Sequence, residues 1–97
     1  MNLTQDDLLF RAMKHPTRRA IIAALLHHES SAAVFAAEHE ITVAAVMKHL
    51  KALEDAGVIT GTKRSRTKFY TLNKERLKDL QDWQDLEEVD WMDSFLL

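Results

Sequence analysis

Apolar residues in the first part of the chain recur with the period of an amphipathic helix. Thr4 precedes the first apolar stripe and Asp7 follows three residues later, which is the arrangement of a capping box. Pro16 is tolerated in a first helical turn but not inside a helix. The pattern therefore predicts one helix that ends before Pro16 and a second that extends to about His28.

Two further helices are predicted between residues 30 and 57. Ser30-Ser31 is expected to cap a short alanine-rich helix that ends near His39. Thr42 is expected to cap a longer one, and Gly57 stands where a left-handed C-terminal cap is expected. The longer helix has one apolar stripe, formed by Val46, Leu50 and Leu53.

After Gly57 the period changes to that of β-strands. Residues 58–63 and 67–72 read as two strands joined by Arg64-Ser65-Arg66. Asn73 is expected to cap a last helix that begins at about Lys74. The order α-α-α-α-β-β-α predicts a mainly α protein with a small β-hairpin, a winged helix-turn-helix domain spanning residues 1–97.

The C-terminal segment has more apolar residues than one small domain can bury. A first set recurs every three residues and winds around a helix: Leu77, Leu80, Trp83, Leu86 and Val89. A second set forms a clean stripe: Trp91, Met92, Phe95 and Leu96. Either several partners cover this helix or it breaks near residues 86–90. The excess favours a dimer interface, and the alternative is that the segment folds back on its own subunit.

Charge divides the chain into a basic body and an acidic tail. Residues 1–78 hold all 13 Lys and Arg against 8 Asp and Glu, whereas residues 79–97 hold 7 acidic residues and no basic one. The body is thus suited to nucleic acid, and the tail reads most simply as a solvated helix face. Cysteine is absent, no apolar run approaches the length of a membrane span, and the first ten residues lack a basic side chain. We therefore expect a cytoplasmic protein that does not contact a membrane.

Three segments together resemble the ArsR/SmtB family of bacterial regulators. "LFRAMKHPTRRAIIAALL" is similar to the first two helices of that family, "VAAVMKHLKALEDAGVIT" to its recognition helix, and "KFYTLN" to its second wing strand. The resemblance implies a homodimer built on the first and last helices, here residues 1–14 and 74–97. The interface residues expected from the pattern and the resemblance are Leu8, Leu9, Met13, Leu77, Leu80, Trp83, Trp91 and Phe95.

The resemblance also implies that each subunit places a helix in the DNA major groove. The family's reading positions correspond to Thr42, Val43, Ala44, Met47 and Lys48. Independently, the buried stripe of this helix leaves Lys48 and Lys51 on its opposite face. Relatives usually have Gln or Ser at several of these positions. Here the apolar side chains can contact thymine methyl groups or simply pack at the groove edge, which leaves Lys48 as the main polar reader and Lys51 for phosphate.

Basic residues surround the tip of the predicted hairpin, namely Lys63, Arg64, Arg66 and Lys68. Such a tip is suited to the DNA backbone or minor groove, and the alternative is a solvated turn. Of Arg18 and Arg19, one is expected to bind phosphate and the other to pair with an acidic neighbour. Ser65 and Glu40 stand where the family often has glycine, so a left-handed backbone would be costly at either.

The usual metal ligands of the family are missing. Its thiolate positions correspond to Ser31 and Ala33, and no histidine lies beyond His49. His27 and His28 point to different faces of a helix and form a poor chelating pair. His49 lies beside the buried stripe and reads as a packed or phosphate-bonded residue. We therefore expect neither a metal site nor a cofactor.

These features favour a sequence-specific, DNA-binding transcriptional repressor that acts as a homodimer on an operator without sensing metal. No glycine-rich phosphate loop or nucleophile–base arrangement suggests an enzyme. The alternative is a winged-helix protein-interaction module with weak or no DNA binding, because Val34, Val43 and Met47 lie on faces that are usually more polar.

Overall fold

The two N-terminal helices begin at the caps that the sequence predicts. The computed structural model describes residues 3–76 and Lys78. Helix α1 spans Gln5–Met13, and Thr4 and Asp7 form the capping box with two 3.1 Å hydrogen bonds. Helix α2 spans Pro16–Leu25 with the proline in its first turn. It ends before His27, so the expected end near His28 is wrong by about one turn.

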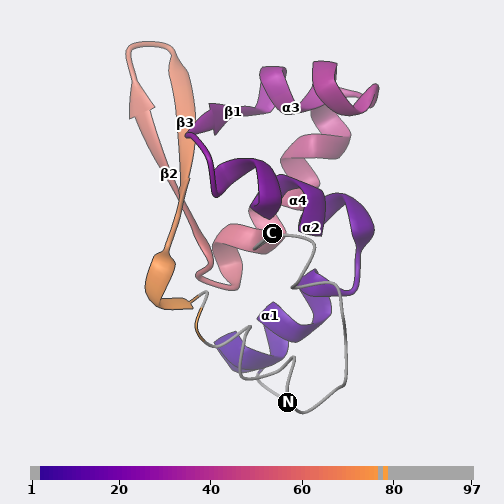
Figure 1. Ribbon diagram of the computed structural model, residues 1–97, viewed down its shortest axis with the longest axis vertical. Coiled ribbons are helices and arrows are strands. Elements are labelled where there is room, and N and C mark those ends of the chain that lie inside the picture. Colours follow the sequence, from indigo (N-terminus) through magenta and orange to yellow (C-terminus); the bar gives the residue numbers. More distant parts are fainter. Residues whose placement is uncertain (1–2, 77, 79–97) are drawn as a thin grey trace.

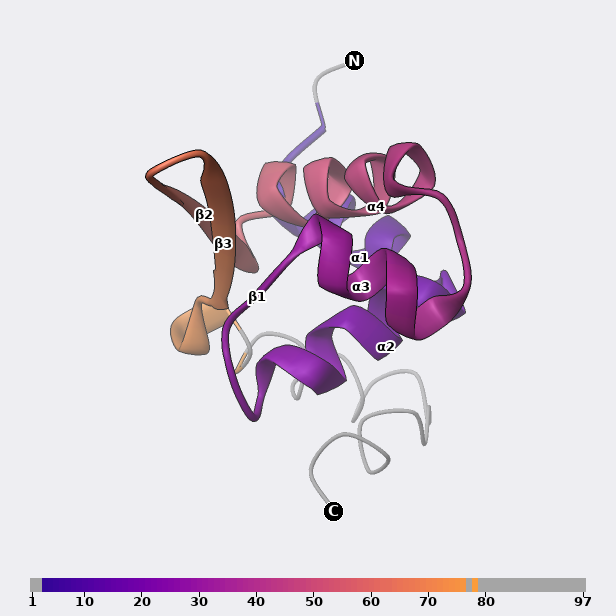
Figure 2. The same cartoon turned by 90° about the horizontal axis from the view of Figure 1, so that it is seen from above.

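The two central helices lie on the same side of the hairpin as α1 and α2 (Figures 1 and 2). Helix α3 spans Ala32–His39 and α4 spans Val43–Asp55, capped by the hydroxyls of Ser31 and Thr42. Gly57 has a φ of 77°. This turn lets the Val58 N–H donate to the Leu53 carbonyl at 3.2 Å, which closes α4 with a Schellman motif.

The hairpin belongs to a three-stranded antiparallel sheet. Strand β2 spans Ile59–Arg64 and β3 spans Thr67–Leu72, close to the predicted bounds. A two-residue strand β1, Ser30–Ser31, pairs with the other side of β3, so the strand order is β1-β3-β2. The sequence did not predict β1. Figure 2 shows it running from the end of α2, along the hairpin, to the start of α3.

One apolar core joins α1, α2, α3, α4 and the base of the sheet. Its largest fully buried side chains are Tyr70, Phe35, Leu9, Ile21, Ile22, Leu50, Leu53, Val46 and Val58. The predicted stripe of α4 is thus confirmed as its buried face. Because Tyr70 is 1% exposed, the root of the wing is packed into the helical body while its tip projects beyond it (Figure 1).

Two of the residues expected at the dimer interface belong instead to this core. Leu9 and Met13 are 0% and 3% exposed in a single chain, so they have no surface left for a partner. Leu8 is half-buried against the same core. The other five expected interface residues, Leu77, Leu80, Trp83, Trp91 and Phe95, lie outside the described residues.

Both positions where relatives often have glycine adopt a left-handed backbone. Glu40 has a φ of 55° at the end of α3, and Ser65 has a φ of 59° at the hairpin tip. At Glu40 the turn allows the Ile41 N–H to donate to the Ala36 carbonyl at 3.2 Å. The chain keeps these turns with non-glycine residues, at a cost of about 1–2 kcal/mol each.

The start of the last helix is fixed to the body by side-chain hydrogen bonds. Asn73 accepts from the Glu75 N–H at 3.2 Å, as predicted for its cap, and donates to the Gly57 carbonyl at 3.1 Å. Arg76 donates to the Ala56 carbonyl and pairs with Asp6 of α1 at 2.8 Å. The beginning of this helix therefore has a defined position beside α1 and the end of α4.

Candidate nucleic-acid interface

The exposed face of α4 carries the residues predicted to read DNA. Its buried stripe turns inward, so Val43, Ala44, Met47, Lys48 and Lys51 are all exposed. Val43 and Met47 are 49% and 46% exposed, so neither belongs to the buried core. The Thr42 hydroxyl accepts from the Ala45 N–H at 3.1 Å and is thus occupied as the helix cap.

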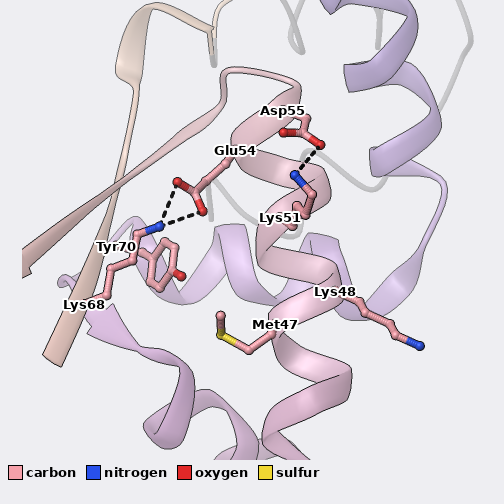
Figure 3. Close-up of a pocket in the computed structure, with 7 residues that line it drawn as sticks. All are labelled: Met47, Lys48, Lys51, Glu54, Asp55, Lys68 and Tyr70. Carbon is pink, nitrogen blue, oxygen red and sulfur yellow. Dashed lines mark hydrogen bonds and ion pairs between the residues drawn. The ribbon is translucent and has the colours of Figure 1, made fainter. Parts of the chain in front are cut away.

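A cleft of about 500 Å³ separates this face from β3. It is lined by Met47, Lys48, Lys51, Glu54, Asp55, Lys68 and Tyr70 (Figure 3). Lys51 pairs with Asp55 at 3.5 Å along the helix, and Lys68 reaches across the cleft to both Glu54 oxygens at 3.3 Å. In Figure 3 Lys48 points away from these ion pairs and makes none of its own with another described residue.

Gly61 makes room for the ion pair that crosses the cleft. A Cβ at Gly61 would lie 2.2 Å from Cε of Lys68 and 3.0 Å from the Tyr70 ring. The Lys68 stem therefore passes over Gly61, with its ammonium 5.3 Å from the Tyr70 ring centre. The hydrogen bond to Glu54 raises the pKa of Lys68, and burial raises the pKa of the Tyr70 phenol. Both groups therefore keep their protons at neutral pH.

The four cations of the wing fall into two kinds. Arg64 pairs with Glu29, in the loop before β1, and lies over the Phe69 ring at 4.0 Å. Lys68 pairs with Glu54, as described above. Lys63 and Arg66 are exposed and form no ion pair with any other residue of the described part. The tip thus offers two uncommitted charges and two that are already held by carboxylates.

Arg18 and Arg19 connect the start of α2 to other elements. Arg18 donates from Nε to Nδ1 of His49 on α4 at 3.1 Å, and Arg19 donates to the Met13 carbonyl at 2.7 Å. The His49 ring also packs against His15, with 4.4 Å between ring centres. Burial, followed by the nearby His15 and Arg18, lowers the pKa of His49. His49 is thus packed, as expected, and its hydrogen bond requires an unprotonated Nδ1.

Of the predicted DNA-binding residues, four line the cleft: Met47, Lys48 and Lys51 from α4, and Lys68 from β3. The other predicted residues of the helix and the wing lie outside it, and Arg18 and Arg19 lie at the start of α2. Sequence reasoning missed Glu29, Glu54 and Gly61, which hold or accommodate the wing cations. Of these three, only Glu54 could have been placed from the sequence, because it directly follows Leu53, the last residue of the predicted apolar stripe of α4.

Residues 3–76 and 78 contain neither a cluster of metal ligands nor a membrane-spanning helix. No group of three or more His, Cys, Asp or Glu side chains comes together as a metal site. No helix in this part of the chain is long and apolar enough to cross a membrane.

Comparisons with known proteins agree with this arrangement. A family model for a helix-turn-helix domain matches residues 13–62. An uncharacterized HTH-type transcriptional regulator of Bacillus subtilis, YuzN, is 32% identical over 76% of this chain and 88% of its own length. The B. subtilis transcriptional repressor SdpR is 31% identical over 77% of this chain and 83% of its own. A crystal structure of an ArsR family transcriptional regulator superimposes with a TM-score of 0.77 at 27% identity, covering 92% of this chain and 98% of the other.

The fold and these matches define a winged helix-turn-helix protein, a DNA-binding transcriptional regulator. The chain belongs to the ArsR/SmtB family of such regulators.

Proposed function

We propose that the protein is a sequence-specific repressor that binds its operator as a homodimer. The observation that carries the proposal is the cleft between α4 and β3, where an exposed helix face with Lys48 and Lys51 meets a basic hairpin. A helix of this kind fits the major groove while a basic hairpin contacts the flanking backbone. The repressor activity of the relative SdpR supports the sign of regulation.

Different residues have different tasks in this proposal. The five residues at the N-terminal half of α4's exposed face lie at base edges: Thr42, Val43, Ala44, Met47 and Lys48. Lys51 contacts phosphate from the same helix, and Lys63 and Arg66 contact it from the wing. Arg64 and Lys68 reach phosphate only by exchanging their carboxylate partners for it, and Arg18 and Arg19 contact phosphate at most in a supporting role.

The homodimer is proposed to use residues 1–14 and 74–97 within a single domain of residues 1–97. Leu8 retains partial exposure on α1, and Arg76 fixes the start of the last helix beside it. A homodimeric winged helix-turn-helix domain from Mycobacterium bovis has the same fold, with a TM-score of 0.69 at 18% identity. Sedimentation of a chain truncated after Val89 is expected to show weakened association, and an unchanged dimer would exclude the end of the tail as a major interface.

We further infer that the protein is neither an enzyme nor a metal sensor and that it acts in the cytoplasm. The family's thiolate positions are Ser31 and Ala33, and neither side chain is a useful ligand for a soft metal.

The decisive experiment is a gel shift of the protein's own promoter fragment, combined with a reporter driven by the same promoter. Specific binding is expected, with affinity that falls steeply as salt rises, and the reporter is expected to rise when the gene is deleted. A reporter that falls instead would identify an activator, the activity of another relative, HlyU of Vibrio cholerae. Binding no tighter than to random DNA at low salt would reject the proposal.

A protein-interaction module is the second candidate, favoured by the exposure of Val34, Val43 and Met47. In that case binding to a partner protein would persist at salt concentrations that abolish DNA binding.

A further inference from the structure

The N-terminal half of the exposed α4 face is apolar. In the described part of the chain, four large apolar side chains are exposed, and two of them, Val43 and Met47, are one helical turn apart on α4. Ala44, also exposed, lies beside them. None of the three offers a conventional hydrogen bond to a base edge.

Charged residues border this apolar surface. Lys48 follows it on the same helix and makes no ion pair with another described residue. Farther along the cleft, Lys51 is paired with Asp55 and Lys68 is paired with Glu54 (Figure 3). A protein partner that covered the apolar surface would also have to desolvate these charges. Duplex DNA complements both features, because phosphates line the edges of the major groove and thymine presents a methyl group on its floor.

We propose that Val43 and Met47 are specificity-determining residues that recognise 5-methyl groups of pyrimidines in the major groove. The inference rests on the proposed function and names the base feature that the same site selects. The methyl group of 5-methylcytosine projects from the same ring carbon as that of thymine. An apolar contact at that position therefore accepts either base, so cytosine methylation within the operator strengthens binding.

The test removes single methyl groups from DNA. An operator is selected from a random pool with the full chain, and each thymine is replaced in turn by deoxyuridine, which keeps the base pairing. Affinity is expected to fall about fourfold at each contacted thymine, because burying a group of this size is worth about 0.8 kcal/mol and about 1.4 kcal/mol is tenfold. At the same position, 5-methylcytosine is expected to bind about fourfold more tightly than cytosine.

Protein variants assign the effect to the two residues. Val43→Ser combined with Met47→Gln changes only exposed positions, so the fold is expected to persist, as circular dichroism can verify. This variant is expected to bind thymine and deoxyuridine operators equally. Lys51→Ala is the matched control on the same helix: it weakens binding to both operators and leaves their ratio unchanged.

The outcomes separate this inference from the proposed function. Specific binding with no deoxyuridine effect at any thymine overturns the methyl recognition and leaves the repressor intact. A deoxyuridine effect that persists in the double variant overturns the assignment to Val43 and Met47. Failure to select any operator overturns both proposals together.

Discussion

The exposed face of α4 and the wing differ in chemistry, although α4 and strand β3 of the wing line one cleft. The α4 face is apolar at its N-terminal half, and Lys48 is the cation there that makes no ion pair within the described chain. The wing carries four cations, of which Arg64 and Lys68 are paired with carboxylates. The exposed α4 face is thus poor in charge, whereas the wing is rich in charge that carboxylates partly neutralise.

Under the proposed function, the wing contributes most of the affinity for DNA and the α4 face contributes the sequence preference. Contacts between cations and phosphate are independent of sequence and dominate the salt dependence of binding. Contacts to base edges contribute discrimination. We therefore expect substitutions in the wing to alter binding to all DNA and substitutions on α4 to alter the choice of site.

The largest effect is expected from removing both unpaired wing cations. In Lys63→Ala/Arg66→Ala, the homodimer loses four phosphate contacts, so the slope of log affinity against log salt should become shallower by about 4, and affinity at 0.15 M salt should fall about 1000-fold on specific and random DNA alike. Fluorescence anisotropy over a salt series measures both. Lys63→Arg/Arg66→Lys, which keeps both positive charges at the tip, is the matched control and should retain the slope. A normal slope in the alanine variant would contradict the assignment.

A tenfold effect on the operator is expected from Lys48. If its ammonium contacts base acceptors, Lys48→Ala should lower operator affinity about tenfold and shift the preferred sequence, with a smaller change on random DNA. Lys51→Ala removes one phosphate contact per subunit and should instead lower both affinities of the homodimer about 30-fold at 0.15 M salt. Competition between operator and random duplexes separates the two. Equal losses on both DNAs for Lys48→Ala would remove Lys48 from the reading residues.

A gain of affinity is expected when the paired wing cations are released. Exposed ion pairs are worth about 0–1 kcal/mol, so Glu54→Gln or Glu29→Gln should raise affinity for all sequences about threefold as Lys68 or Arg64 becomes available. Glu38→Gln removes an exposed charge that has no ion pair with another described residue, and it serves as the control. If all three variants bind alike, net charge rather than release of a specific cation controls affinity.

The smallest effect concerns pH, and it acts on the α4 side of the comparison. His49 has a pKa below the ordinary 6.5 in the folded protein, so its contribution to stability is complete above 6.5. As pH falls below that value, the unfolded chain takes up the proton first and the free energy of unfolding decreases.

Thermal unfolding between about pH 7.5 and about pH 5.5 tests this expectation. The side-chain oxygen of Gln accepts a hydrogen bond from Arg18 and does not titrate, so His49→Gln should show a smaller loss of stability on acidification. An identical pH dependence would show that the Arg18–His49 contact is energetically silent.

Local signals in the sequence predicted most of the fold. Thr4, Thr42 and Gly57 lie at helix ends and act through neighbours within a few residues, so their roles are readable from the chain. Strand β1 was missed because two residues carry no period and their pairing with Tyr70 and Phe69 is long-range. The same serine pair has a second role, since Ser31 is also the cap of α3.

The site was less predictable than the fold. The basic residues that favour DNA binding could be read from the sequence. Their carboxylate partners could not, because Glu29 is 35 residues from Arg64 and Glu54 is 14 residues from Lys68. The apolar residues Leu9 and Met13 were likewise predicted to be buried, but the surface that covers them could not be predicted. An amphipathic stripe tells which face of a helix is buried, and it does not tell whether the covering surface belongs to the same chain or to a partner.

The wing is three-stranded only at its base, so its tip can be changed separately from the packed base. Strand β1 pairs with Tyr70 and Phe69, so beyond the Thr62–Phe69 pair the hairpin has two strands and no third neighbour among the described residues. We therefore expect residues 64–67 to tolerate a change of length or sequence at the loss of the Arg64–Glu29 ion pair, while Lys68 stays with the packed base. A hairpin tip from another regulator, grafted at this boundary, is expected to change the affinity for the DNA backbone while α4 keeps the sequence preference.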